Sequence, residues 1–152
     1  MPNVFEPDWD AERDDPPFRW RRARLGRQAG ARDLGASLFE LPPGAATFPL
    51  HAHYANEELL VVLAGRLTLT GVDGATRTLE PGDVVACPAG RDGAHRLDNA
   101  ADDPARVLIL STMKAPEVNE MLEDNSFWVR DYAPGQAPGE QALDVNGLRP
   151  PS

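Results

Sequence analysis

Residues 44–65 read GAATFPLHAHYANEELLVVLAG, and this stretch decides the fold. It places His51 and His53 one residue apart, then two glutamates, then an aliphatic run that ends at a glycine. Alternate side chains of a strand share a face, so these two imidazoles point the same way with α-carbons about 6.6 Å apart. The chain has only three histidines, and the third, His95, follows a Pro-Ala-Gly turn. The pattern predicts that the imidazoles and a carboxylate converge on one metal ion.

This stretch resembles the first motif of the cupins. In that motif a glycine is followed by His-x-His, three or four residues, a glutamate, six residues and a second glycine. Glu58 fits the pattern, because four residues separate it from His53 and six separate it from Gly65. Glu57 misses the second spacing, and strand alternation places it on the opposite face from Glu58. The resemblance therefore implies that Glu58 is the carboxylate ligand.

A second cupin-like motif follows. Residues 82–90 read GDVVACPAG and are followed by His95 and Asn99. The two motifs, in order, resemble those of small single-domain bacterial cupins of unassigned activity, over about residues 36–112. The resemblance implies one divalent metal ion held by His51, His53, Glu58 and His95.

The spacing departs from the cupin pattern at two places. Six residues precede His51 after Gly44 where five are usual, and four residues separate Gly90 from His95 where two are usual. The second insertion predicts a longer turn at the mouth of the barrel, with Gly93 supplying backbone freedom. Arg91 and Asp92, on that turn, are interpreted as an ordinary solvated turn rather than as an anion site.

Short runs rich in aliphatic and β-branched residues, separated by proline and glycine turns, predict an all-β fold. The strands are expected at residues 36–41, 58–63, 66–70, 76–79, 83–87, 95–97 and 106–111. This series fits a jelly-roll barrel, the double-stranded β-helix of the cupins, with N- and C-terminal arms.

The chain divides into three predicted segments: an acidic N-terminal arm (1–17), a barrel domain (18–113) and a partly ordered C-terminal extension (114–152). The arm is expected to be solvated because it is rich in Asp, Glu and Pro. Residues 18–25 are expected to form an edge strand, or a strand exchanged with a second subunit, with its arginines toward solvent and Phe18 and Trp20 packed inward. In the extension we expect one or two helical turns at 115–122, a short strand or a packing segment at 126–130 and a loosely ordered tail from residue 133.

Charge and composition limit the partners. The net charge is −9, whereas a nucleic-acid-binding domain is normally basic, so the six arginines between residues 19 and 32 do not indicate nucleic acid. The lone Cys87 allows no intrachain disulfide, and no signal peptide or membrane span is evident, which predicts a cytoplasmic protein without a membrane partner. Both faces of the strand at 58–63 are apolar, so we expect a second subunit or the arms to cover the outer face, and we predict a homodimer.

Two functions remain open from the sequence. Three imidazoles and one carboxylate leave two positions on a six-coordinate ion, which suits iron, manganese, nickel or cobalt; zinc fits less well, because four protein ligands would close its site. The protein is then either a metal-dependent enzyme on a small polar organic molecule, of oxygenase or isomerase/lyase type, or a noncatalytic module that binds or senses a small molecule. Tyr54, Arg96 and Asp98 are predicted to point away from the ion, and this lack of an acid–base partner argues against an isomerase.

Overall fold

Antiparallel strand pairing organises the chain in the computed structural model, which describes residues 1–132 and 144–148. The described elements, in chain order, are β1 (Ala11–Asp15), β2 (Phe18–Ala23), α1 (Leu25–Gln28), β3 (Gly35–Leu41), β4 (His51–His53), β5 (Glu58–Ala64), β6 (Leu67–Gly71), β7 (Thr76–Leu79), β8 (Val84–Cys87), a 3-10 turn (Arg91–Gly93), β9 (His95–Asp98), β10 (Ala105–Ser111), β11 (Glu117–Met121), β12 (Ser126–Arg130) and β13 (Asp144–Leu148).

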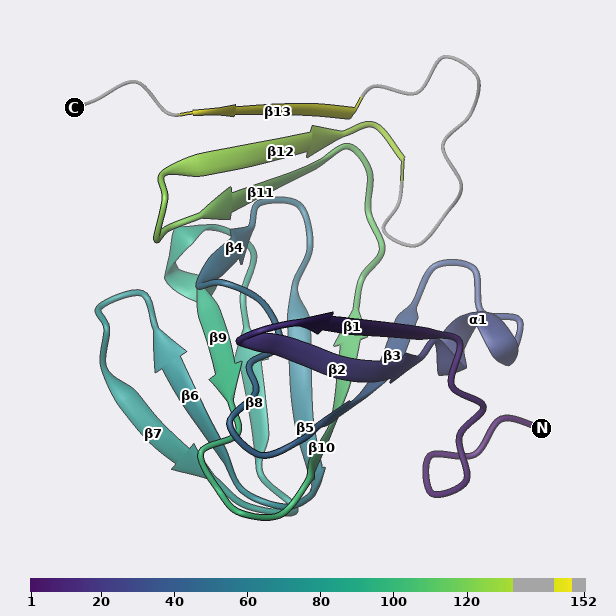
Figure 1. The fold of residues 1–152 in the computed structure, drawn as a ribbon. Coiled ribbons are helices and arrows are strands. Elements are labelled where there is room, and N and C mark those ends of the chain that lie inside the picture. The colour runs from purple at the N-terminus through teal and green to yellow at the C-terminus, as the bar shows by residue number, and fades with distance from the viewer. Residues whose placement is uncertain (133–143, 149–152) are drawn as a thin grey trace.

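The strands form two sheets. One has the order β1-β2-β3-β10-β5-β8 and the other β13-β12-β11-β4-β9-β6-β7 (Figure 1). Strands that are distant in sequence lie side by side, as in a double-stranded β-helix; β10, for example, pairs with both β3 and β5. The predicted all-β jelly-roll barrel is confirmed, and each strand predicted between residues 36 and 111 is present with ends within one residue.

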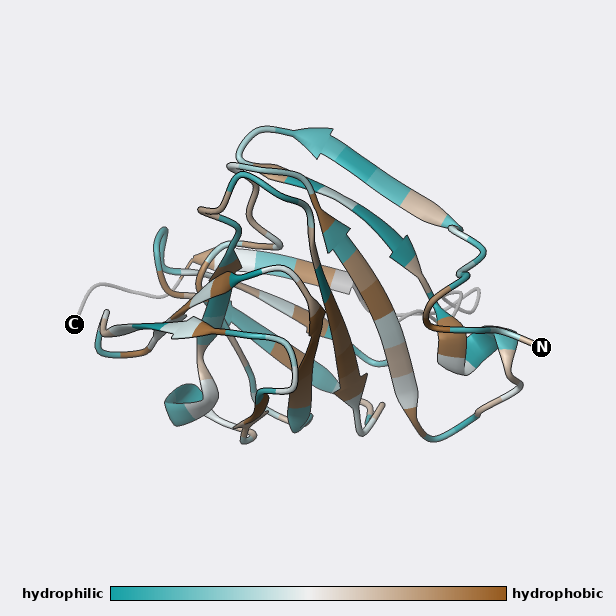
Figure 2. Cartoon of the chain, turned by 90° about the horizontal axis from the view of Figure 1, so that it is seen from below, coloured by the Kyte–Doolittle hydropathy of each residue, from teal (hydrophilic) through white to brown (hydrophobic). Residues whose placement is uncertain are grey.

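The main hydrophobic core lies between the two sheets. Leu60 and Val62 on β5 belong to one buried cluster with Leu67 on β6 and Leu97 on β9. Figure 2 shows the hydrophobic stretches concentrated on central strands of the barrel. Because Glu58 shares the inward face of β5 with Leu60 and Val62, this packing directs its carboxylate into the barrel.

The helical turn predicted for residues 115–122 is wrong. Residues Glu117–Met121 form β11, which pairs with β4 on one side and β12 on the other. Its side chains alternate with a period of two, and Glu117, Asn119 and Met121 share the face that lines an internal cavity. Pairing with two neighbouring strands outweighs the local helical preference.

The acidic segment also differs from the predicted solvated arm, because Ala11–Asp15 forms β1. This strand pairs with the arginine-rich β2, which places Glu12 opposite Arg21 and Asp14 opposite Arg19. Opposite charges that face each other across two strands favour their pairing. The strand at 126–130 is confirmed as β12. Of the predicted tail, β13 is described, and residues 133–143 and 149–152 lie outside the described residues.

The outer face of the first sheet is partly covered by the chain's own N-terminal segment. Val4 and Trp9 pack against a second cluster that includes Leu38 of β3, with Leu63 of β5 and Leu108 of β10 at its margin. No helix among residues 1–132 and 144–148 is long and apolar enough to cross a membrane.

Homodimer formation stays a prediction. On β8, the edge strand beside β5, Val84 is 58% exposed, and the neighbouring Val61 on β5 is half-buried. We expect a second copy to cover this surface, because water-exposed apolar patches favour association. Light scattering of the full chain at micromolar concentration is expected to give the dimer mass, and deletion of residues 1–25 is expected to give monomers or aggregates. A monomeric full-length protein would contradict the prediction.

Candidate metal centre and cavity

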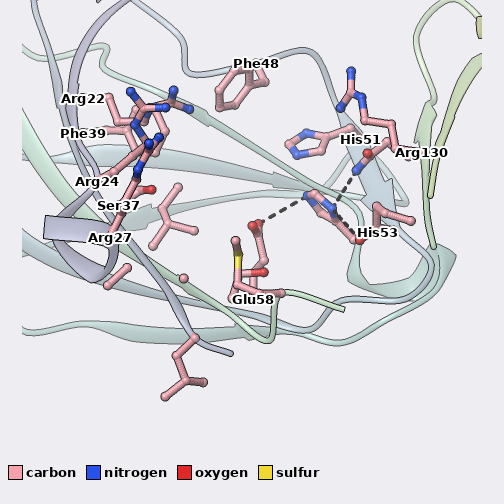
Figure 3. A pocket seen from close by; sticks show the side chains of 18 of the residues that line it. Arg22, Arg24, Arg27, Ser37, Phe39, Phe48, His51, His53, Glu58 and Arg130 are labelled. Carbon is pink, nitrogen blue, oxygen red and sulfur yellow. Dashed lines mark hydrogen bonds and ion pairs between the residues drawn. The ribbon is translucent and has the colours of Figure 1, made fainter. Parts of the chain in front are cut away.

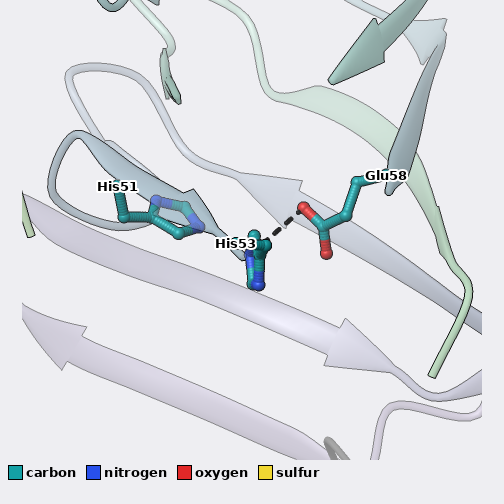
Figure 4. A group of neighbouring side chains, drawn as sticks. All are labelled: His51, His53 and Glu58. Atoms are coloured by element: carbon teal, nitrogen blue, oxygen red, sulfur yellow. Dashed lines mark ion pairs between the residues drawn. The ribbon is translucent and has the colours of Figure 1, made fainter. Parts of the chain in front are cut away.

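Three strands position the four predicted ligands. His51 and His53 occupy the two ends of the short strand β4, and His95 begins β9 directly opposite His51. Glu58 begins β5 in the other sheet. The side chains therefore approach one another from both sheets, as Figure 4 shows for His51, His53 and Glu58.

The potential metal-ligand atoms of the four side chains lie close together. The ligand atoms of His51, His53 and Glu58 lie within 4.8 Å of one another. His95 stands beside this group, with its Nε2 3.2 Å from Glu58 Oε2 and its ring centre 4.7 Å from that of His51. Glu58 Oε2 is also 3.5 Å from His53 Nε2. The structure thus brings all four residues together, and metal coordination by the four stays a prediction.

Backbone carbonyls orient two of the imidazoles. Nδ1 of His51 lies 2.9 Å from the Pro49 carbonyl oxygen, and Nδ1 of His95 lies 3.0 Å from that of Gly93. A carbonyl oxygen only accepts hydrogen bonds, so each Nδ1 carries the proton and donates it. Nε2 of each ring is then the atom left to face a cation, which is the arrangement usual for metal-binding histidines. For His51 this nitrogen carries a free lone pair, whereas His95 must release the Nε2 proton that it shares with Glu58 when an ion binds.

His53 is oriented by side chains of β11 instead. Its Nδ1 lies 2.6 Å from Asn119 Nδ2 and 3.6 Å from Glu117 Oε2. Because an asparagine amide can present either its nitrogen or its oxygen, Asn119 can serve either tautomer of His53. Glu117 is only 1% exposed and accepts hydrogen bonds from the backbone N–H groups of Tyr54 and Ala55, which fix the loop after β4.

The protein side chains alone already favour metal-binding protonation states at two ligands. Burial lowers the pKa of His51 to about 3, reinforced by His95 and His53. Burial opposes ionisation of Glu58, but the neighbouring imidazoles, His53 first, outweigh it and lower its pKa to about 2. Burial also disfavours the charged form of His95, yet hydrogen bonds to Cys87 and Glu58 raise its pKa to about 10. Cys87 is buried as predicted.

The four residues line a cavity of about 770 Å³ that opens between the two sheets (Figure 3). Its lining combines apolar side chains, such as Phe39, Phe48 and Met121, with polar groups. The volume is within the range of pockets that hold small organic molecules. An ion held by this group would therefore face a ligand in the cavity.

Sequence reasoning missed cavity residues on two strands. Glu117 and Asn119 were missed because residues 115–122 were predicted to be helical, although the alternation of polar residues in this stretch indicated a strand. The expectation that the arginines of residues 18–25 face solvent is wrong for Arg22 and Arg24, which line the cavity. Position 22 has the same parity as Phe18 and the buried Trp20, so alternation carries it to the inner side.

The lengthened turn before His95 folds back on itself. Gly93 lies so close to Pro88 that a Cβ atom there would be 1.8 Å from the Pro88 carbonyl oxygen. This close approach absorbs the two extra residues, so that His95 still begins β9. Arg91 is not simply solvated, because it pairs with the buried Glu120, which also accepts a 2.7 Å hydrogen bond from the Tyr54 hydroxyl.

The residues predicted to point away from the ion do so. Arg96 donates two hydrogen bonds from Nε, of 2.9 and 3.1 Å, to Asp98 on its own strand. Neither residue lines the cavity in the described part of the chain, and the same holds for Tyr54 and the exposed Glu57.

Comparison of the chain with protein families and with solved structures identifies similar proteins. Residues 37–111 match the family described as Cupin domain. No curated protein matches the sequence. A solved structure of a sugar phosphate isomerase from a cupin superfamily of Silicibacter pomeroyi shares 31% identity, covers 74% of this chain and 71% of that chain, and has a TM-score of 0.69.

Two further structures share the fold. A protein from Acidithiobacillus ferrooxidans, provisionally described as a sugar phosphate isomerase, is 24% identical over 90% of this chain and 85% of that chain, with a TM-score of 0.72. At this identity the likeness shows the fold alone. A polyketide cyclase from Streptomyces resistomycificus is 25% identical over 72% of this chain and 78% of that chain, with a TM-score of 0.60.

Proposed function

The chain belongs to the cupin superfamily, and from that premise we propose that it is a metal-dependent enzyme that acts on a small polar organic molecule. The observation that carries the proposal is the position of His51, His53, Glu58 and His95 on the wall of a cavity of about 770 Å³. A cluster with only a structural role would not need to face so large a space.

The donor set fits a divalent transition metal. Imidazole nitrogens and one carboxylate suit iron, manganese, nickel or cobalt, with zinc a poorer fit. Such an ion, when bound, polarises an oxygen atom of the substrate or lowers the pKa of a bound water. The desolvation of Glu58 inside the barrel supports the proposal, because a buried carboxylate is stabilised by a cation.

The surrounding side chains would prepare the site for this role. Asn119 and Glu117 hold the His53 ring, and the carbonyls of Pro49 and Gly93 hold the other two imidazoles. Phe48 packs edge-on against His51 at 5.9 Å between ring centres and keeps water from that side of the ring. A substrate in the cavity would meet ligands whose orientation is already fixed, which reduces the cost of organising the reaction.

We favour isomerisation as the reaction class, because the cavity wall includes a carboxylate, Glu117, that sequence reasoning missed and that offers the acid–base partner an isomerase needs. The relative from Silicibacter pomeroyi, at 31% identity, is described as a sugar phosphate isomerase. The alternative is a noncatalytic module that binds or senses a small molecule, and the apolar part of the lining, including Phe39 and Ile109, favours that function.

Metal-loaded protein is expected to interconvert an aldose phosphate and a ketose phosphate at the same rate under air and under argon, because isomerisation consumes no oxygen. The assay screens a panel of such sugars by NMR against the His51→Ala/His53→Ala double variant, which is expected to be inactive. Turnover only in air would instead indicate an oxygenase. Saturable binding without any turnover would establish the noncatalytic module.

A further inference from the structure

Arginines gather on one wall of the cavity. Arg22 comes from β2, Arg24 precedes α1, Arg27 lies on α1, and Arg32 follows it in the loop to β3. In Figure 3, Arg22, Arg24 and Arg27 stand together on the side of the cavity away from His51 and His53. The whole chain is acidic, with a net charge of −9, so a local group of cations facing an internal space calls for a physical reason.

These arginines are unequally neutralised. Arg24 donates from Nε to Asp10 at 2.9 Å, and Asp10 also accepts a hydrogen bond from Gln28. Within residues 1–132 and 144–148, neither Arg22 nor Arg27 forms an ion pair, and the buried Nε of Arg22 has no hydrogen-bond partner. Asp33 lines the same wall, but it is exposed. A buried N–H without an acceptor is costly, and an anion in the cavity would supply the acceptor.

The guanidinium of Arg22 is held in place by aromatic rings. Its carbon lies 5.5 Å from the ring centre of Trp20 and 5.9 Å from that of Phe39, within the range of cation–π contacts. Burial lowers the pKa of Arg22, and the neighbouring charge of Arg24 lowers it further, so its charged form lacks full compensation from the protein. Cation–π contact alone leaves the hydrogen-bond donors of the guanidinium without acceptors.

A row of aromatic contacts connects this wall to the histidines. Phe39 lies 5.7 Å from Phe48, and Phe48 lies 5.9 Å from His51, measured between ring centres. Two aromatic rings therefore separate Arg22 from the metal-ligand group. A ligand that lies along these rings would reach both the arginines and the ligand group.

We propose that Arg22, together with Arg24 and Arg27, binds an anionic group, a phosphate or a carboxylate, at the end of the substrate remote from the histidines. The description of this ligand as a substrate rests on the proposed function; the anion site itself does not. A planar guanidinium pairs with either oxyanion through two parallel hydrogen bonds, and its aromatic contacts reduce the entropy lost on binding.

The test is calorimetric titration of EDTA-treated protein with inorganic phosphate and, separately, with acetate, so that no metal contributes to anion binding. We expect phosphate to bind the wild-type chain, and Arg22→Gln and Arg27→Gln each to weaken it about tenfold or more. Arg77→Gln, an exposed arginine of β7 outside the cavity, is the matched control and should leave binding unchanged. Tighter binding of phosphate than of acetate assigns a phosphate group, and the reverse order assigns a carboxylate.

Two further readouts separate this inference from the proposed function. Arg22→Gln should retain its metal content, and the His51→Ala/His53→Ala variant should still bind the anion. Thermal unfolding checks that each variant folds, and because Arg27 is exposed its variant remains informative if Arg22→Gln does not fold. The anion site would be overturned if neither phosphate nor acetate bound, or if Arg22→Gln and Arg27→Gln both bound the anion as tightly as the wild type. Either result would leave metal-dependent catalysis intact.

Discussion

The His51→Ala/His53→Ala double variant is expected to purify with about a tenth or less of the metal found in the wild-type chain, for which we expect one ion per chain. The change removes two of the four donors, and both come from the same strand, β4. The remaining Glu58 and His95 lie 3.2 Å apart and would pair with each other rather than hold an ion. Elemental analysis of both proteins after dialysis measures the loss.

A matched control uses the same spacing elsewhere in the barrel. Thr76→Ala/Thr78→Ala alters two alternate, exposed residues of β7 and should keep the full metal content. Added Mn²⁺ or Co²⁺ should raise the unfolding temperature of the wild type and of this control but not that of the histidine variant, because only a bound ligand stabilises the folded state. Metal retained at wild-type level in the histidine variant would show that the ion binds elsewhere.

The sequence predicts this barrel well where local pattern and tertiary contact agree. Residues 76–79, for instance, lie between two turn sequences and form β7 at the expected bounds. The two motifs were enough to predict one group that contains His51, His53, Glu58 and His95, and the structure places these residues together. This worked because the face of each strand residue and the position of each turn are determined by the local sequence. The same reasoning separated the exposed Glu57 from the inward Glu58.

Prediction failed where a segment depends on contacts that its own residue pattern does not show. β11 is held by β4, whose residue His53 pairs with Asn119, and no local signal carries that contact. β1 forms because its acidic residues meet the arginines of β2. Arg22 was assigned to solvent by its charge, whereas its parity with Trp20 and the aromatic rings around it place it on the cavity wall. For β1 and for Arg22, a charge pattern that suggested solvent was compensated by another part of the chain.

Removing the carboxylate at position 58 tests the strand register that underlies the whole site. Glu58→Gln is expected to weaken metal binding roughly a hundredfold or more, because breaking a buried charge pair costs about 3–5 kcal/mol. The Glu58 side chain is 13% exposed and contacts both His53 and His95, whereas Glu57 is exposed and lies outside the cavity. Glu57→Gln is therefore the matched control and should bind metal as the wild type does.

Competition with a fluorescent chelator measures both affinities, and the metal-free proteins add a second readout. Glu58→Gln deprives His95 of the anion beside it; although burial lowers the pKa of His95, its bonds to Cys87 and Glu58 raise it to about 10. The stabilisation from protonated His95 is therefore present below its unfolded pKa of roughly 6.5 and is lost as the pH rises through about 10. Metal-free Glu58→Gln should then be less stable than Glu57→Gln at pH 6, with the difference shrinking toward pH 10. Equal losses of metal affinity in the two variants would mean that β5 is displaced by one residue, because a one-residue slip exchanges the faces of positions 57 and 58.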